Sequence, residues 1–156
     1  MNKSLVSHAA ISVAAAVIAS FATYLSMTGA PSALSQAHAQ PAPAPVPGLR
    51  QTELFKTTMN DVLGRVVTIR RTERAAGTGS PAHRHPGSHT FGYILEGSYE
   101  VKIDDGPVRT LGPGEVFYEA PNALHAISRN ASAAAPVTYL VIQVSDPSKP
   151  ATVNEP

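Results

Sequence analysis

Turn-forming residues divide the chain, from about residue 50 onward, into short segments, and this spacing limits the folds it can adopt. The segments Arg65–Glu73, Ser98–Ile103 and Val137–Val144 are rich in Val, Ile, Thr and Tyr, which favour β-strands. Turn signals such as Asp104–Pro107 and Gly112–Gly114 lie between strand-like segments. This region contains no convincing amphipathic helix. Roughly seven or eight short strands, with a turn signal about every 8–12 residues, predict an all-β antiparallel sandwich or barrel.

The first 39 residues have a different character and predict a signal peptide. Lys3 gives a positive start, Ala9–Leu25 is apolar or small, and Ala37–Ala39 is an A-x-A cleavage site. We expect this short signal helix over residues 1–39 to be removed on export, leaving a periplasmic or secreted protein. The alternative is an uncleaved N-terminal membrane anchor, since the apolar run is just long enough to span a bilayer.

The rest of the chain divides by composition into three parts. Residues 40–49 (QPAPAPVPGL) alternate proline with small residues and predict an extended linker. Residues 50–146 have the size of one domain, and residues 147–156, with Pro, Ser and Thr, predict a flexible tail.

Composition narrows the chemistry and the partners of the exported chain. It has no cysteine, which excludes disulfides, thiolate metal sites and a thiol nucleophile. Removal of Lys3 with the signal leaves equal numbers of basic and acidic residues. Nothing in this balance indicates nucleic acid or an anionic membrane surface as a partner. A membrane partner is expected only if the signal stays uncleaved.

All four histidines outside the signal fall in two strand-like regions. His83 and His85 are two residues apart and project to one face of an extended strand. His89 follows after a Pro-Gly turn, and His125 lies in a later segment. Imidazole is the commonest transition-metal ligand, so this pattern predicts a metal site. The alternative for His83, His85 and His89 is that they are exposed loop or turn residues.

The spacing around these histidines carries a family resemblance. Two groups of residues carry it: Gly77, His83, His85 and Gly97 in the first, and Gly114, Pro121, His125 and Asn130 in the second. Over Arg65–Asn130 the chain resembles small single-domain cupins, which are double-stranded β-helix (jelly-roll) barrels. The resemblance implies a divalent transition metal, and the ligand types admit Fe, Mn, Ni, Cu or Zn.

One departure from the cupin pattern affects the ligand set. The glutamate ligand of the first motif is missing. Counting forward from His85 places its position at His89, whereas counting back from Gly97 places it at Thr90. One residue reverses the face of a strand. The site is therefore either four histidines, namely His83, His85, His89 and His125, or three with an open position.

A site of neutral imidazoles leaves the metal charge uncompensated and favours an anionic, chelating small molecule. The resemblance and this chemistry imply a metal-dependent dioxygenase acting on a small enolizable or aromatic substrate. The alternatives are a non-catalytic metal- or ligand-binding sensor module and a structural dimer with a vestigial site. In each case we expect a homodimer. The expected substrate-pocket residues are apolar or aromatic: Phe91, Tyr93, Val101, Phe117 and Tyr139.

Overall fold

The computed structural model of the protein describes residues 45–156, and this part of the chain contains strands and turns without a helix. The strands, in chain order, are β1 (Leu49–Thr58), β2 (Val66–Arg74), β3 (Gly79–Ser80), β4 (His83–Arg84), β5 (Ser88–Glu96), β6 (Tyr99–Ile103), β7 (Arg109–Leu111), β8 (Val116–Glu119), β9 (Leu124–Asn130), β10 (Val137–Ser145) and β11 (Val153–Asn154). The predicted all-β class is confirmed. The predicted signal peptide lies outside the described residues, as does the linker up to residue 44.

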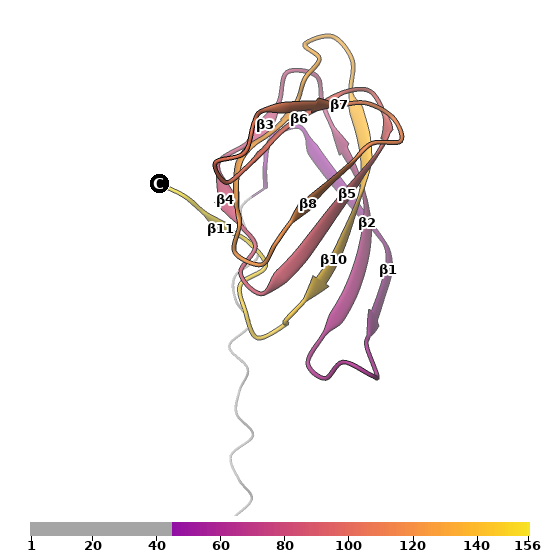
Figure 1. Ribbon diagram of the computed structural model, residues 1–156. Coiled ribbons are helices and arrows are strands. Elements are labelled where there is room, and N and C mark those ends of the chain that lie inside the picture. The colour runs from indigo at the N-terminus through magenta and orange to yellow at the C-terminus, as the bar shows by residue number, and fades with distance from the viewer. Residues whose placement is uncertain (1–44) are drawn as a thin grey trace, which may run out of the picture. The chain divides into compact units, whose positions relative to one another are not determined.

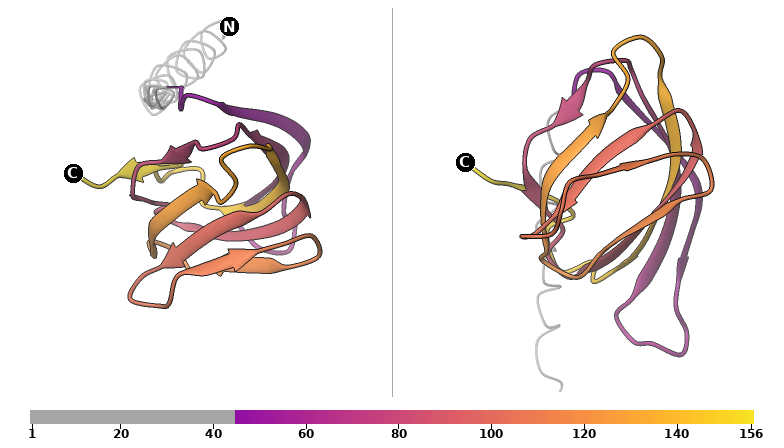
Figure 2. Two further views of the ribbon diagram at one scale, coloured as in Figure 1. Left: turned by 90° about the horizontal axis from the view of Figure 1, so that it is seen from above. Right: turned by 45° about the horizontal axis from the view of Figure 1, so that its top comes forward.

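The strands form two antiparallel sheets that curve toward each other (Figures 1 and 2). The first sheet has the order β1-β2-β10-β5-β8, and the second has the order β11-β4-β9-β6-β7, with β3 paired to β9. β10 pairs with both β2 and β5, although about 40 residues separate it from β5 and more than that from β2. These non-local pairings give the double-stranded β-helix that the sequence predicts.

The apolar core lies between the sheets, toward one end of the barrel. It is formed by buried residues of both sheets: Ile94, Tyr99, Val101, Leu111, Phe117, Val137 and Tyr139. On β6, Tyr99 and Val101 are buried and Ile103 is partly buried. Burying a large apolar side chain contributes about 1.5–3 kcal/mol, so this cluster stabilises the frame that holds the polar end.

Strand β5 has a strict alternation that decides which of its residues face inward. Ser88, Thr90, Gly92 and Ile94 are buried, whereas the residues between them are exposed or half-buried. Gly92 is required because a Cβ there would collide with the ring of Phe117 on the paired strand β8. Gly97 ends the strand in a turn with φ +80°, a conformation that glycine adopts without strain.

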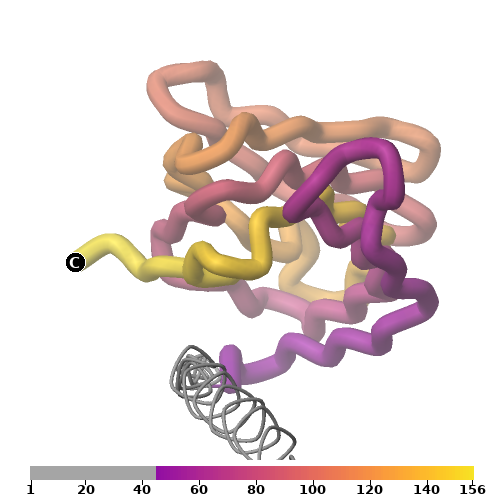
Figure 3. The backbone as a smooth tube through the Cα atoms, turned by 90° about the horizontal axis from the view of Figure 1, so that it is seen from below, coloured from indigo at the N-terminus to yellow at the C-terminus, as the bar shows by residue number. Residues whose placement is uncertain are grey.

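The C-terminal segment is more ordered than its composition suggests. We expected a flexible tail over residues 147–156, but Val153–Asn154 form β11, which pairs with β4. The backbone N–H of Glu155 donates to Ala82, and the Glu155 carboxylate pairs with Arg84 at 2.5 Å. In Figure 3 this yellow segment runs across the end of the barrel turned to the viewer. Within residues 45–156, no helix is long and apolar enough to cross a membrane.

Candidate metal and ligand site

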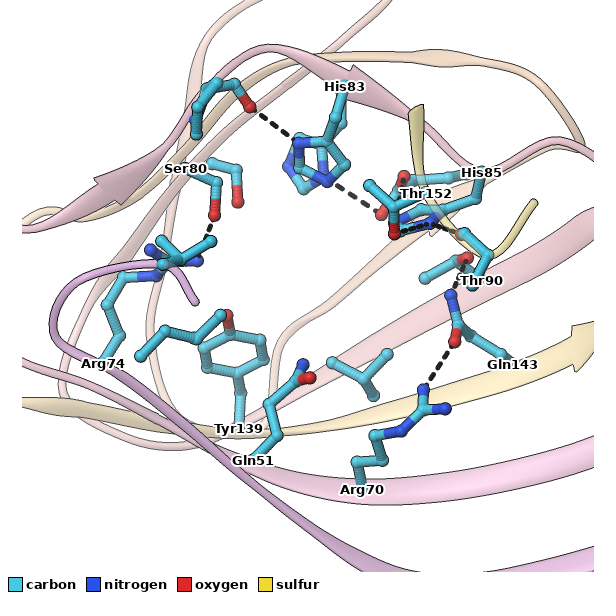
Figure 4. Close-up of a pocket in the computed structure, with 18 of the residues that line it drawn as sticks. Gln51, Arg70, Arg74, Ser80, His83, His85, Thr90, Tyr139, Gln143 and Thr152 are labelled. Carbon is cyan, nitrogen blue, oxygen red and sulfur yellow. Dashed lines mark hydrogen bonds and ion pairs between the residues drawn. The ribbon is translucent and has the colours of Figure 1, made fainter. Parts of the chain in front are cut away.

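A cavity of about 440 Å³ lies at the polar end of the barrel, between the two sheets. Its walls carry three histidines, a glutamate and two arginines: His83, His85, His125, Glu119, Arg70 and Arg74. Phe117, Tyr139 and Val141 supply apolar wall, and Ala151 and Thr152 line it from the C-terminal segment. Figure 4 shows His85 and Thr90 on one side of this cavity, with Arg74 and Ser80 on the other.

Strand pairing brings His83, His85 and His125 together. His83 and His125 are register partners on β4 and β9, and their ring centroids are 5.0 Å apart. The His83 and His85 rings are also 5.0 Å apart. The predicted same-face pair and its downstream partner therefore meet in one place.

Each of these three rings uses Nδ1 to hold an acceptor. His83 Nδ1 donates to the carbonyl of Pro81 at 2.8 Å, and His85 Nδ1 donates to the carbonyl of Ala151 at 2.7 Å. His125 Nδ1 lies 3.1 Å from the Glu119 carboxylate. Because these acceptors fix the proton on Nδ1, each Nε2 keeps its lone pair. Metal-binding histidines in proteins are commonly oriented in this way.

Glu119 is a site residue that the sequence reasoning missed. It lies at the end of β8, is 1% exposed, and is the register partner of Thr90 on β5. Its other oxygen, Oε2, is 3.9 Å from His85 Nε2. Glu119 comes two residues after Phe117, which was expected from the sequence to face the pocket. Residues two apart on a strand share a face, so this spacing could have identified Glu119 as a pocket residue.

The protonation states of this cluster follow from burial and contact. Desolvation lowers the pKa of His83 from 6.5 to about 4, so this imidazole is neutral at pH 7. Burial opposes ionisation of Glu119, but the hydrogen bond from His125 and the nearby imidazoles hold the pKa of that carboxyl below its usual value. The cluster therefore offers the neutral imidazole of His83 and one carboxylate anion, that of Glu119.

Two buried atoms of the cluster lack a hydrogen-bond partner among the described residues, namely His125 Nε2 and Glu119 Oε2. Leaving a buried polar atom unsatisfied costs about 1–3 kcal/mol. As the side chains stand, no three His, Asp or Glu residues within 45–156 converge on one point in coordination geometry. The donor types and the two unsatisfied atoms nevertheless fit a divalent transition metal.

The structure resolves the ambiguity between His89 and Thr90. Thr90 faces the cavity, whereas His89 lies on the outer face of β5, where its Nδ1 hydrogen bonds to the hydroxyl of Tyr118 at 2.8 Å. His89 is therefore separated from the other three histidines by the sheet. Neither residue carries a carboxylate, and the carboxylate nearest to Thr90 in register is that of Glu119 on the neighbouring strand β8.

The five expected pocket residues divide among the cavity wall, the core and the outer face of the sheet. Phe117 and Tyr139 line the cavity, and Val101 belongs to the core cluster. Phe91 and Tyr93 do not line it: they are 41% and 40% exposed on the outer face. The alternation of β5 explains this correction, because Thr90 and Gly92 occupy the inward positions.

Arg70 and Arg74 were also missed as cavity residues. Both lie on β2, on the face that carries Thr68 and Thr72. Neither arginine was given a role in the site by the sequence analysis. Charged residues facing inward on a strand were the available signal, because only a polar interior can accommodate them.

The fold and this polar cluster define a class: double-stranded β-helix proteins with a histidine-lined internal site. Residues 70–143 match the family described as the cupin domain (Cupin_2). The described part of the chain therefore contains a small cupin domain, as the sequence motifs predict.

Solved structures agree with this family. The protein TT1209 from Thermus thermophilus is similar over 64% of this chain and 85% of its own, with 25% identity and a TM-score of 0.52. A cupin-like protein from Thermotoga maritima is similar over 69% of this chain and 75% of its own, with 19% identity and a TM-score of 0.54. Both likenesses support the fold.

A third solved structure matches a smaller share of this chain. The DMSP lyase DddQ from Ruegeria pomeroyi is 26% identical with a TM-score of 0.48, and the match covers 56% of this chain. The chain spans only 42% of the length of that enzyme. No curated protein sequence matches this chain.

Proposed function

We propose that this cupin binds one divalent transition metal through His83, His85 and His125, with Glu119 as the carboxylate of the site. The observation that carries the proposal is the shared hydrogen-bonding pattern of the three rings, each with Nδ1 against an acceptor, which leaves Nε2 as the nitrogen available to a metal. Fe, Mn, Ni, Cu and Zn are all compatible with this nitrogen and oxygen donor set.

We further propose an oxygenase-type enzyme acting on a small enolizable or aromatic substrate. A redox metal would supply the activation of oxygen or of the substrate anion. Phe117, Tyr139 and Val141 provide apolar wall that excludes water around a flat substrate. Burial raises the pKa of Tyr99 well above its usual value, so this phenol stays protonated, and its hydroxyl shares a hydrogen bond with that of Ser128.

The second candidate is a non-catalytic module that binds metal or a small ligand. The hydrogen bond between His125 and Glu119 favours it, because two proposed ligands already contact each other. A binding protein needs no open coordination position. In either role we propose an exported protein, periplasmic or secreted, from the signal-like first 39 residues.

Metal content tests the first proposal directly. Protein purified from the periplasm should carry about one metal per chain by elemental analysis, and His125→Ala should lose it. His89→Ala is the matched control, because His89 lies on the outer face of the sheet, and it should keep the metal. Wild-type protein that remains metal-free when offered each of the five ions would contradict the proposal.

Oxygen uptake separates the two candidate functions. Metal-loaded wild-type protein should consume oxygen with at least one member of a panel of catechols, 2-oxo acids and 1,3-diketones. Binding of panel members without oxygen consumption would instead support the non-catalytic module.

A further inference from the structure

Arg74 is a buried cation whose charge has no partner in the described part of the chain. Its side chain lines the cavity and is 2% exposed. Nη2 donates to Ser80 Oγ at 2.8 Å, whereas Nε and Nη1 have no hydrogen-bond partner. Among residues 45–156, no carboxylate lies within ion-pair distance of this guanidinium.

The nearby acids are engaged elsewhere. Glu73, the preceding residue on β2, points to the other face and pairs with Arg50 and Arg71. Glu119 is held by His125. An uncompensated buried charge is costly, and a guanidinium lacking partners on two nitrogens is the group that best matches a carboxylate.

The rest of the cavity supports an anionic ligand. Apart from the histidines, its charged residues are two arginines and one glutamate, so the lining is cationic even before a metal adds its charge. Arg70 donates from Nη1 to Gln143 Oε1 at 2.7 Å, and Gln143 Nε2 donates to Thr90 Oγ1 at 3.2 Å. These two hydrogen bonds fix Arg70 beside the cavity. The other N–H groups of its guanidinium have no acceptor among the described residues.

We propose that Arg74 binds a carboxylate group of the substrate, while Arg70, four residues away on β2, adds a second positive charge to the cavity wall. The substrate class is then a small carboxylic acid whose other end is a chelating enol, 2-oxo or catechol group. This inference rests on the proposed function for the chelating end only. The carboxylate end depends on Arg74, which lies across the cavity from His85 in Figure 4.

Paired ligands test the carboxylate end. Zinc-loaded protein, which cannot turn over by redox chemistry, is titrated calorimetrically with 3,4-dihydroxybenzoate and with catechol, which lacks the carboxylate. We expect 3,4-dihydroxybenzoate to bind about 10- to 100-fold more tightly, the range for hydrogen bonds to a charged group. In Arg74→Gln this advantage should disappear while the affinity for catechol is unchanged.

Two further variants keep the result interpretable. Arg71→Gln removes the same charge from the outer face of the same strand and should leave the advantage intact. If Arg74→Gln does not fold, Arg74→Lys retains the charge but loses the planar fork, and it should reduce the advantage. Equal affinities of the two ligands for wild type, or an advantage that survives in a folded Arg74 variant, would overturn the proposal.

Metal-free protein distinguishes failure of this inference from failure of the proposed function. Benzoate and its neutral isostere benzamide are titrated by NMR into metal-free wild type and Arg74→Gln. Preference for benzoate in wild type alone supports the inference even if zinc never binds, in which case only the metal proposal fails. No preference for benzoate in wild type would overturn the inference even if zinc binds fully.

Discussion

At the scale of single residues, the buried carboxylate of the cluster lies on β8 and not on β5. Thr90 is the inward-facing one of the two β5 residues to which counting assigns the cupin glutamate. Glu119 is its register partner on β8, so both side chains reach the same region of the cavity. A register pair can thus supply the same donor from either strand.

Exchange of these two residues tests this view. Glu119→Thr should weaken zinc binding about 10- to 100-fold, the range for loss of a ligand or of the group that orients one. The double variant Thr90→Glu/Glu119→Thr should recover much of the loss, because the carboxylate returns to the paired position and total side-chain volume is conserved. Competition with a chromophoric chelator gives the affinities. Wild-type affinity in Glu119→Thr would contradict a metal role for this carboxylate.

The sequence could identify the three clustered histidines but not the glutamate and the two arginines around them. His83 and His85 follow from a two-residue spacing, and His125 from its place in the second motif. Alternation along the strands turns three further residues inward: Glu119, Arg70 and Arg74. The sequence alone does not show which face of β2 is the inner one, because its apolar residues Val67 and Ile69 face outward. Hydrophobicity indicates the core face only when the interior is apolar, and this cavity is polar.

At the scale of elements, β11 connects the end of the chain to the site. Pairing of β11 with β4 holds Ala151 so that its carbonyl accepts from His85 Nδ1. Composition predicted fraying here, because the segment is short and contains Pro and Thr. Its order comes from a partner strand about 70 residues earlier, and such a non-local pairing leaves no local sequence signal.

None of the side chains of residues 150–156 is a proposed metal ligand. Removal of this segment should nevertheless weaken metal binding at the site. We expect zinc affinity to fall about tenfold, because His85 loses the acceptor that orients its ring, together with faster amide exchange in β4. Glu155→Gln is the control: it removes only the ion pair with Arg84, worth about 0–1 kcal/mol in a partly exposed setting, and should leave zinc affinity unchanged. A truncated protein with wild-type zinc affinity would show that β11 does not position His85.

At the scale of the whole molecule, the outer face of the first sheet is unusually apolar. One row of register partners crosses all five strands: Phe55, Ile69, Ile142, Phe91 and Tyr118. Phe91 and Tyr118 also contact each other, with ring centroids 5.0 Å apart. Apolar surface that is continuous over several strands typically marks an interface.

The predicted homodimer is best placed on this face. A two-fold axis makes one patch serve both subunits, and the row offers no charged side chain to oppose such contact. Phe91→Glu should convert the dimer to monomer, because it buries a carboxylate without a partner in the interface. The fold should persist, since Phe91 is outside the core cluster.

Val108→Glu is the control, because Val108 is exposed in the turn before β7 and lies away from the row. Light scattering after size exclusion gives the mass. A monomeric wild type would contradict the predicted homodimer, and a Phe91→Glu variant that stays dimeric would place the interface elsewhere.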